Sequence, residues 1–185
     1  IGDFARQTYH PRELVVVHDG DAAFDAALRA LATAHGVDAI VDRVAPSQPL
    51  GALRNRSLEL ARGAIVAQWD DDDRHHPQRL ALQLDAMRRQ EAVAAFSTEQ
   101  LHWFPARALM FWEDWQSDAW PLDAVQGTLI GARAQLPRYP DAARGEDSAL
   151  MIELARSGAP VARIKGIGWS YVYTFHGRNA WDAAH

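Results

Sequence analysis

The alternation between two hydrophobic periods constrains the fold of this chain more than any other feature of its sequence. Residues 13–18 (ELVVVH) form a short β-branched run, and residues 22–35 then carry apolar side chains at helical spacing. The change of period recurs, with strands predicted at 38–44, 64–69 and 92–97 and helices at 53–61 and from 77 onward. This order predicts an α/β fold with a mostly parallel sheet and helices on both faces.

The second half of the chain is less regular. Residues 98–130 show no clean period, and strand-like pieces are expected only near 107–112 and 126–132. Further along, the pattern predicts a helix at 146–157 and closing strands at 162–166 and 169–176. Two caps are also expected in the first half, with Asp21 beginning the helix at 22–35 and Gly36 ending it.

Four consecutive aspartates, 70–73, directly follow the predicted strand at 64–69. Ligands of open α/β sheets collect at the carboxyl ends of strands. If the chain stays extended there, Asp70 and Asp72 point to one side and Asp71 to the other. Two carboxylates on one side suit Mg²⁺ or Mn²⁺, whose other ligands are commonly phosphate oxygens. The pattern favours a metal and phosphate site over a solvated acidic turn.

Composition excludes several classes of protein. The 185 residues indicate one domain, and the absence of cysteine excludes thiol catalysis, thiolate metal sites and disulfides. The net charge of −5, without a dense basic stretch, argues against a nucleic-acid partner. No apolar run is long enough to cross a bilayer, and no signal peptide is visible. We expect a cytoplasmic protein, or one peripheral to the inner membrane face; the oligomeric state is not predicted.

Four stretches, in this order and at these spacings, resemble the family 2 glycosyltransferases of the GT-A fold. They are FARQTYHPRELVVVHDGD (4–21), LGALRNRSLELARGAIVAQWDDDDRHHPQRLALQ (50–83), GTLIGARA (127–134) and RGEDSALMIELARSG (144–158). The resemblance implies a single Rossmann-like GT-A domain over 1–185, with a nucleotide-binding half at about 1–97 and an acceptor and catalytic half at about 98–185. It also implies an inverting, metal-dependent transfer of a sugar from a nucleotide-sugar donor to an acceptor hydroxyl, in the synthesis of surface glycans or glycoconjugates.

The resemblance assigns the acidic block to the DxD motif of this family. Asp70, Asp71 and Asp72 would then bind the diphosphate and a divalent metal ion, Mn²⁺ or Mg²⁺, with Asp72 as the expected direct ligand. His176, in YTFHGRN, matches a late histidine that completes the metal or diphosphate site, and Asn179 lies in the same closing motif.

Three further positions match residues of the nucleotide site. Asp19 matches an aspartate that contacts the base, although the second acid that often precedes it in the family is His18 here. Arg54 and Asn55 match an arginine–asparagine pair beside the nucleotide. The resemblance implies a UDP-, GDP- or dTDP-sugar as donor and a glycan, a lipid-linked molecule or a protein as acceptor, without choosing among them.

Catalysis would fall to the pair Glu146 and Asp147, which matches the ED pair of the family, with Asp147 as the catalytic base. A base is needed because an acceptor hydroxyl is a weak nucleophile. No covalent enzyme intermediate is required. Trp112 and Trp115 are candidate acceptor contacts, because sugar rings stack on aromatic side chains; they could equally belong to the core.

The chain departs from the family pattern at its start. The first strand of the family, which lies centrally in the sheet, is missing from this chain. The strand at 13–18 should therefore lack one neighbour, which would leave the domain unstable unless the chain is a truncated form. A start at Ile1 instead of Met suggests the same.

Each assignment has a plainer alternative. Asp147 could be a first-turn acid favoured by the helix dipole, Asp19 a turn residue, and His176 a polar strand end. Asp73, His75 and His76 receive no role. At the level of the whole protein, the alternatives are a metal-dependent phosphohydrolase or phosphotransferase with an aspartate nucleophile, and a non-catalytic protein that binds nucleotides or glycans.

Overall fold

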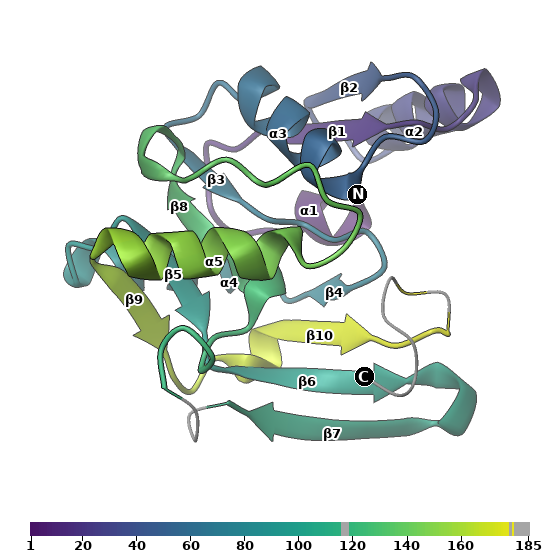
Figure 1. Cartoon of the computed structure of the whole chain (residues 1–185). Helices are drawn as coiled ribbons and strands as arrows, with labels where there is room; N and C mark the ends of the chain where they lie inside the picture. Colours follow the sequence, from purple (N-terminus) through teal and green to yellow (C-terminus); the bar gives the residue numbers. More distant parts are fainter. Residues whose placement is uncertain (116–118, 178, 180–185) are drawn as a thin grey trace.

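Strands and helices alternate along the first half of this computed structural model, which describes residues 1–115, 119–177 and 179 (Figure 1). The α-helices are α1 (Gly2–Ala5), α2 (Ala22–Ala34), α3 (Leu50–Leu60), α4 (Arg79–Arg89) and α5 (Glu146–Ser157). The strands are β1 (Leu14–His18), β2 (Ala39–Arg43), β3 (Ile65–Ala67), β4 (Arg74–His75), β5 (Ala94–Ser97), β6 (Glu99–Phe104), β7 (Leu109–Asp114), β8 (Ile130–Ala132), β9 (Val161–Ile164) and β10 (Tyr171–Thr174). The predicted α/β class is confirmed.

The strands form three hydrogen-bonded sheets with mixed pairing. β1 pairs with β2 in parallel. A second sheet has the order β3-β8-β5-β9, and a third has the order β4-β10-β6-β7. The pairing is more antiparallel than the sequence suggested, because β8 comes from the second half and inserts antiparallel between β3 and β5. β8 and β9 both pair with β5, so the predicted halves on either side of residue 97 share one sheet.

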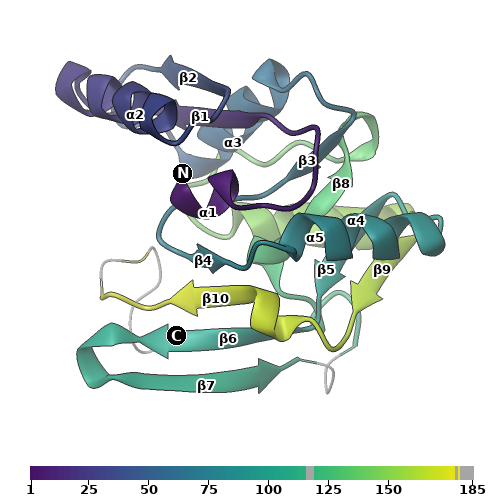
Figure 2. The same ribbon diagram turned by 180° about the vertical axis from the view of Figure 1, so that it is seen from behind.

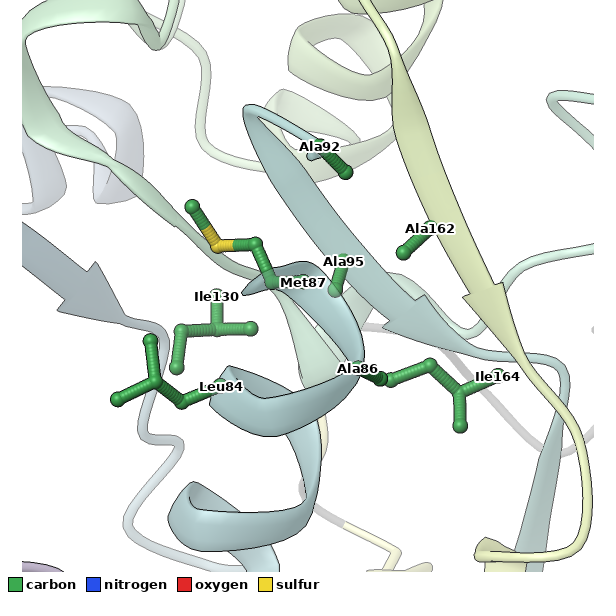
Figure 3. Close-up of a cluster of buried hydrophobic side chains, with 8 residues drawn as sticks. All are labelled: Leu84, Ala86, Met87, Ala92, Ala95, Ile130, Ala162 and Ile164. Atoms are coloured by element: carbon green, nitrogen blue, oxygen red, sulfur yellow. The ribbon is translucent and has the colours of Figure 1, made fainter. Parts of the chain in front are cut away.

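Helices α4 and α5 cover opposite faces of the β3-β8-β5-β9 sheet (Figures 1 and 2). Successive residues of a strand face opposite ways, so Ala95 packs under α4 whereas Ala94 and Phe96 pack under α5. Figure 3 shows the cluster on the α4 side, where Leu84 and Met87 meet the small alanines of the strands. The short alanine side chains let both helices approach the sheet closely.

Helix α2 begins and ends as the sequence predicts. The Asp21 carboxylate accepts a hydrogen bond from the N–H of Phe24 at 2.8 Å, and Gly36 follows the helix with a φ of 63°. The apolar face of α2 is exposed, however: the side chains of Phe24 and Leu31 are 48% and 46% exposed. Both line a cleft of about 1440 Å³ between β1 and β3. Within the described residues β1 pairs only with β2, as expected for a strand that lacks one neighbour.

The third sheet contains two strands that the sequence did not predict, β4 and β6. Apolar residues of β6 lie on both of its faces (Leu101, Trp103 and Phe104), so the alternation that marks a strand is absent. β7 covers much of the predicted piece at 107–112, and β8 lies within the one at 126–132. In both views of the molecule, no α-helix of the described chain lies over β6 and β7 (Figures 1 and 2), although the short 3-10 helix at Gly168–Ser170 packs against β6.

The core under α5 gives a direct test of this packing. Leu150 is 1% exposed in that core, whereas Ile152 on the same helix is 37% exposed. We expect Leu150→Ala to lower the free energy of unfolding by about 2–5 kcal/mol, because it removes buried methyl groups and leaves a cavity. Urea unfolding would measure this, with Ile152→Ala as the control that changes stability by less than about 1 kcal/mol. Equal losses for the two variants would contradict the packing described.

Candidate functional site

The four aspartates occupy a turn between β3 and β4, and each engages different partners. Asp70 accepts hydrogen bonds from Arg54 Nη2 and from Gln68 Nε2, each at 2.9 Å. Asp71 is exposed. Because residues 71–73 turn instead of extending, the alternation that paired Asp70 with Asp72 does not apply there. Their role as joint metal ligands stays a prediction.

Asp72 faces the segment after β10. Its Oδ2 lies 3.1 Å from Nε2 of His176 and accepts a hydrogen bond from Asn179 Nδ2 at 3.2 Å. Residues separated by about a hundred positions in the sequence therefore meet here, and their role in a metal or diphosphate site stays a prediction.

Asp73, to which the sequence gave no role, ties the acidic turn to β10. It is 6% exposed and accepts hydrogen bonds from the hydroxyl of Tyr171 and, at 2.9 Å, from the N–H of Thr174. Burial raises the pKa of Asp73 to about 7, and the charges of Asp70 and Asp72 add to the rise. Asp73 is therefore the aspartate of the turn that is most easily protonated, chiefly because it is buried.

Arg79 lies under the turn and is fully buried. Its guanidinium donates to the backbone carbonyls of Gln68 and Gly127, both at 3.1 Å, and to Gln83 Oε1 at 3.0 Å. The rings of Trp69 and Tyr171 lie 5.3 and 5.4 Å from the guanidinium carbon. Burial lowers the pKa of Arg79 to about 10, so it is a cation at neutral pH.

Sequence reasoning missed Arg79, although a signal was present. A cation in the first turn of a helix is opposed by the helix dipole. Arg79 is the first residue of α4, so its position indicates partners outside the helix.

His75 is buried beside Arg79 and does not face an open metal position. Its Nδ1 lies 2.6 Å from Arg79 Nη1, and its Nε2 lies 3.3 Å from the carbonyl oxygen of Asp70. Because arginine only donates, Nδ1 accepts and Nε2 carries the proton. Burial and the Arg79 charge lower the pKa of His75 to about 3. His76 is exposed and packs against the ring of Trp169.

Arg54 joins the acidic turn to the start of α5. Its Nε donates to Glu146 Oε1 at 2.8 Å while Nη2 holds Asp70. Burial alone would lower the pKa of Arg54, but the nearby carboxylates, Asp70 foremost, hold it above the ordinary value. Burial, together with the Asp147 charge, raises the pKa of Glu146.

Asp147 is half-buried in the first turn of α5, where the helix dipole favours a carboxylate. Its Oδ1 accepts a hydrogen bond from the N–H of Ser148 at 2.7 Å. Within the described residues its Oδ2 makes no hydrogen bond, which distinguishes it from the buried and bridged Glu146.

The side chain of Asn55 is hydrogen-bonded to the backbone of Tyr139 and does not point freely into the cleft. Its side chain donates to the carbonyl of Tyr139 at 2.7 Å and accepts from the N–H of Tyr139 at 2.9 Å. α3 approaches this segment so closely that a Cβ at Gly51 would collide with the carbonyl of Pro140. Asn55 therefore fixes the helix that carries Arg54, and its contact with a nucleotide stays a prediction.

Asp19, Arg54 and Asp70 line the same large cleft. Asp19 Oδ2 accepts a hydrogen bond from the N–H of Ser47 at 2.9 Å. His18, at the position of the second acid of the family, is buried and lies 3.2 Å from Asp25 Oδ1, so it supports the fold. The cleft runs along the whole of β1 and β3, from Glu13 and Gly63 at their amino ends to Asp19 and Asp70 at their carboxyl ends. The acidic groups therefore lie at the end of the cleft where ligands of open α/β sheets collect.

The two candidate acceptor tryptophans lie apart from this cleft. Trp112 is 45% exposed on β7, and Trp115 follows that strand with its N–H bonded to the carbonyl of Thr98 at 2.8 Å. Neither lines the cleft. Their role in acceptor binding stays a prediction.

Asp72 and His176 could hold a divalent cation together, because carboxylate oxygens and imidazole nitrogens both ligate such ions. In the structure Asp72 Oδ2 and His176 Nε2 lie 3.1 Å apart, within hydrogen-bond distance of each other, so a bound cation would replace that contact. Across the described ranges, no three His, Asp or Glu side chains converge to hold an ion by themselves. A site with two protein ligands would need ligand oxygens to complete it.

Comparison with known proteins identifies similar chains. The sequence profile described as Glycosyl transferase family 2 matches residues 1–116. The structure of S. aureus TarS 1-349 in complex with UDP has a TM-score of 0.70 at 17% identity, covering 94% of this chain and 54% of that one. The same protein with UDP-GlcNAc has a TM-score of 0.75 at 16% identity, covering 94% and 53%. No curated protein sequence matches.

At these identities the likeness shows a shared fold, and it confirms the predicted GT-A architecture. This chain spans about half the length of the TarS chains. Separately, within the described residues no helix combines the length and apolar character needed to cross a bilayer.

Arg79 offers a test of the support beneath the turn. We expect Arg79→Lys to lower the free energy of unfolding by at least ~3 kcal/mol, because an ammonium cannot reproduce the fork that satisfies several buried acceptors. Arg88→Lys, on the exposed side of α4, should change stability by less than ~0.5 kcal/mol. Urea unfolding monitored by tryptophan fluorescence would measure both, and a stable Arg79→Lys protein would contradict the role assigned here.

Proposed function

Because this chain belongs to glycosyl transferase family 2, we propose that it transfers a sugar from a nucleotide-sugar donor to an acceptor hydroxyl with inversion at the anomeric carbon. The observation that carries the proposal is the Arg54 bridge, which holds Asp70 of the acidic turn against Glu146 of the acidic pair. These groups come from opposite halves of the sequence and have the chemistry that donor binding and proton abstraction require. The alternative function, a phosphohydrolase with an aspartate nucleophile, is not supported by any comparable contact among the described residues.

The donor would lie in the cleft at the carboxyl ends of β1 and β3. Asp19 at one end would contact the base, and Asp70 and Asp71 at the other would lie beside the diphosphate. Arg54, already paired with two carboxylates, would moderate their negative charge. The TarS structures hold UDP and UDP-GlcNAc, so uridine donors are the first to test, ahead of GDP- and dTDP-sugars.

A divalent ion, Mn²⁺ or Mg²⁺, held by Asp72 and His176 together with oxygens of the diphosphate, would supply Lewis-acid stabilisation of the charge on the leaving diphosphate. Asp70 would join this set only by releasing Arg54 or Gln68, which bond to its two oxygens. The proximity of Asp72 and His176, at 3.1 Å, supports this pair of ligands. The Asn179 amide, bonded to Asp72, orients that carboxylate.

Asp147 would act as the base. Its unoccupied Oδ2 takes the proton of the acceptor hydroxyl while the hydroxyl oxygen forms a bond to the anomeric carbon. The bond from that carbon to the diphosphate breaks on the opposite side, and the electron pair leaves with the diphosphate. Glu146, buried and bridged by Arg54, fixes the start of α5 and so positions Asp147.

The acceptor remains a glycan, a lipid-linked molecule or a protein in this proposal, with Trp112 and Trp115 as candidate contacts. We place the reaction in the cytoplasm or at the inner membrane face. The decisive experiment incubates the chain with UDP-, GDP- and dTDP-sugars plus Mn²⁺ and measures nucleotide binding and sugar release. If no nucleotide binds with or without metal, the proposal is wrong.

The metal assignment predicts a selective loss of nucleotide binding. Asp72→Asn should weaken Mn²⁺-dependent UDP binding at least tenfold, because it removes the charge of a direct ligand while keeping the size of the side chain. Calorimetric titration of UDP with Mn²⁺ present and absent would measure this. Asp85→Asn on the exposed side of α4 is the matched control and should bind as the unmodified chain does. Unchanged affinity in Asp72→Asn would refute its role as a ligand.

If Asp147 is the base, its replacement should reduce the rate of sugar transfer without weakening the binding of UDP. Asp147→Asn should keep UDP binding within about twofold but reduce sugar transfer by roughly 100-fold or more, the usual contribution of a general base. Glu153→Gln, exposed on the same helix, should retain activity. If Asp147→Asn turned over at the normal rate, the base would have to be another group.

A further inference from the structure

A patch of aromatic side chains covers one face of the third sheet, and the proposed function has not used it. Tyr173, His102 and Phe111 are in register on β10, β6 and β7, so they project to the same face. Phe104 and Phe175 form the adjoining row on that face. We call these five residues the aromatic face.

The rings of the aromatic face pack into one continuous surface. His102 and Phe104 stack with centroids 4.3 Å apart and planes inclined by 21°. Phe104 and Phe111 are also nearly parallel, at 5.6 Å and 22°. Tyr173 meets His102 edge to face at 4.8 Å, and Phe175 meets Phe104 at 5.5 Å. Phe111 is 38% exposed on the edge strand β7, and no α-helix of the described chain lies over that strand in either view (Figures 1 and 2).

This surface runs directly into the acidic turn. Tyr171, two residues before Tyr173 and on the same face of β10, donates its hydroxyl to Asp73. The N–H of Thr174 also bonds to Asp73, and His176, the residue after Phe175, contacts Asp72. Burial raises the pKa of Tyr173 to about 12, with the carboxylates of Asp73 and Asp72 adding to the rise, which agrees with this proximity.

The chemical groups of the aromatic face indicate which class of ligand it could bind. Its rings offer apolar surfaces, whereas its polar groups are the half-buried Glu113, which accepts a hydrogen bond from the buried Gln100, and the Tyr173 hydroxyl. The neighbouring aspartates make an anionic lipid headgroup or an acidic peptide unfavourable. A neutral polyhydroxylated chain matches both parts, since sugar rings combine apolar C–H faces with hydroxyl edges.

We propose that the aromatic face is the binding platform for a saccharide acceptor, holding its sugar units in a row that leads to the acidic turn. The proposal rests on the proposed glycosyl transfer and adds to it the class of acceptor and the residues that hold it. It makes Phe111 the exposed stacking residue and Tyr173 the residue nearest the reaction. Trp112 projects to the opposite face of β7, so this platform replaces it as the acceptor contact. Protein acceptors that carry no sugar would have no use for this surface.

The test separates saccharide binding from donor binding. Phe111→Ala is compared with Met110→Ala, which removes the neighbouring side chain, 47% exposed on the opposite face of β7. Each protein is applied to a printed array of hexose, hexosamine, deoxyhexose and uronic-acid oligosaccharides, and its affinity for retained glycans is measured. Calorimetry with UDP and Mn²⁺ runs in parallel, and circular dichroism and urea unfolding check that both variants fold.

We expect the unmodified chain and Met110→Ala to bind the same oligosaccharides. Phe111→Ala should bind them roughly tenfold more weakly, the loss of one stacking contact, with UDP affinity unchanged. Phe111→Trp should restore binding. The platform is wrong if UDP binds but no oligosaccharide does, or if Phe111→Ala and Met110→Ala bind glycans equally. Binding only to phosphatidylcholine or phosphatidylglycerol vesicles, lost in Phe111→Ala, would also overturn it. Absence of UDP binding in the unmodified chain would instead count against the proposed transfer.

Discussion

The buried cation of Arg79 is the interaction on which the arrangement of the site depends. A charge without water must be satisfied by several partners at once, and Arg79 finds them on segments far apart in the chain. It holds the end of β3 through Gln68, the loop before β8 through Gly127, and the ring of Tyr171 on β10. Arg79 therefore fixes the base of the turn that carries the aspartates, where the β3-β8-β5-β9 sheet meets the β4-β10-β6-β7 sheet.

A second arginine, Arg54, pairs with carboxylates of the acidic turn and of α5. The acidic turn concentrates negative charge, which would open the turn if nothing opposed it. Arg54 pairs with both Asp70 and Glu146, and His176 contacts Asp72. Asp73 is buried, and its burial, with the charges of Asp70 and Asp72, raises its pKa. Asp70, Asp72 and Asp73 are thus each stabilised by different partners. The same devices leave Asp72 and Asp147 as the groups best disposed for metal binding and proton abstraction in the proposed reaction.

Sequence reasoning was most accurate where one side chain controls a local event. The helix α5 begins at Glu146 and ends at Ser157 as predicted, and Asp21 caps α2. It was least accurate where a residue acts through distant partners. The strand β6 was missed because apolar residues occupy both of its faces, and the contacts of Asp73, His75 and Arg79 depend on segments tens of residues away. The contacts of Asn55 with the backbone of Tyr139 were likewise not foreseen, and its contact with a nucleotide stays a prediction.

The sequence by itself determined the alternation of strands and helices, the family, and the placing of acids at strand ends, because each of these follows from local periodicity or from a contiguous motif. Only the tertiary structure decided that β8 runs antiparallel between β3 and β5, that Arg54 couples the two acidic motifs, and that the aromatic rings of three strands share one face. The reason is physical: register, burial and charge pairing are set by which segments meet, and no local pattern specifies that meeting.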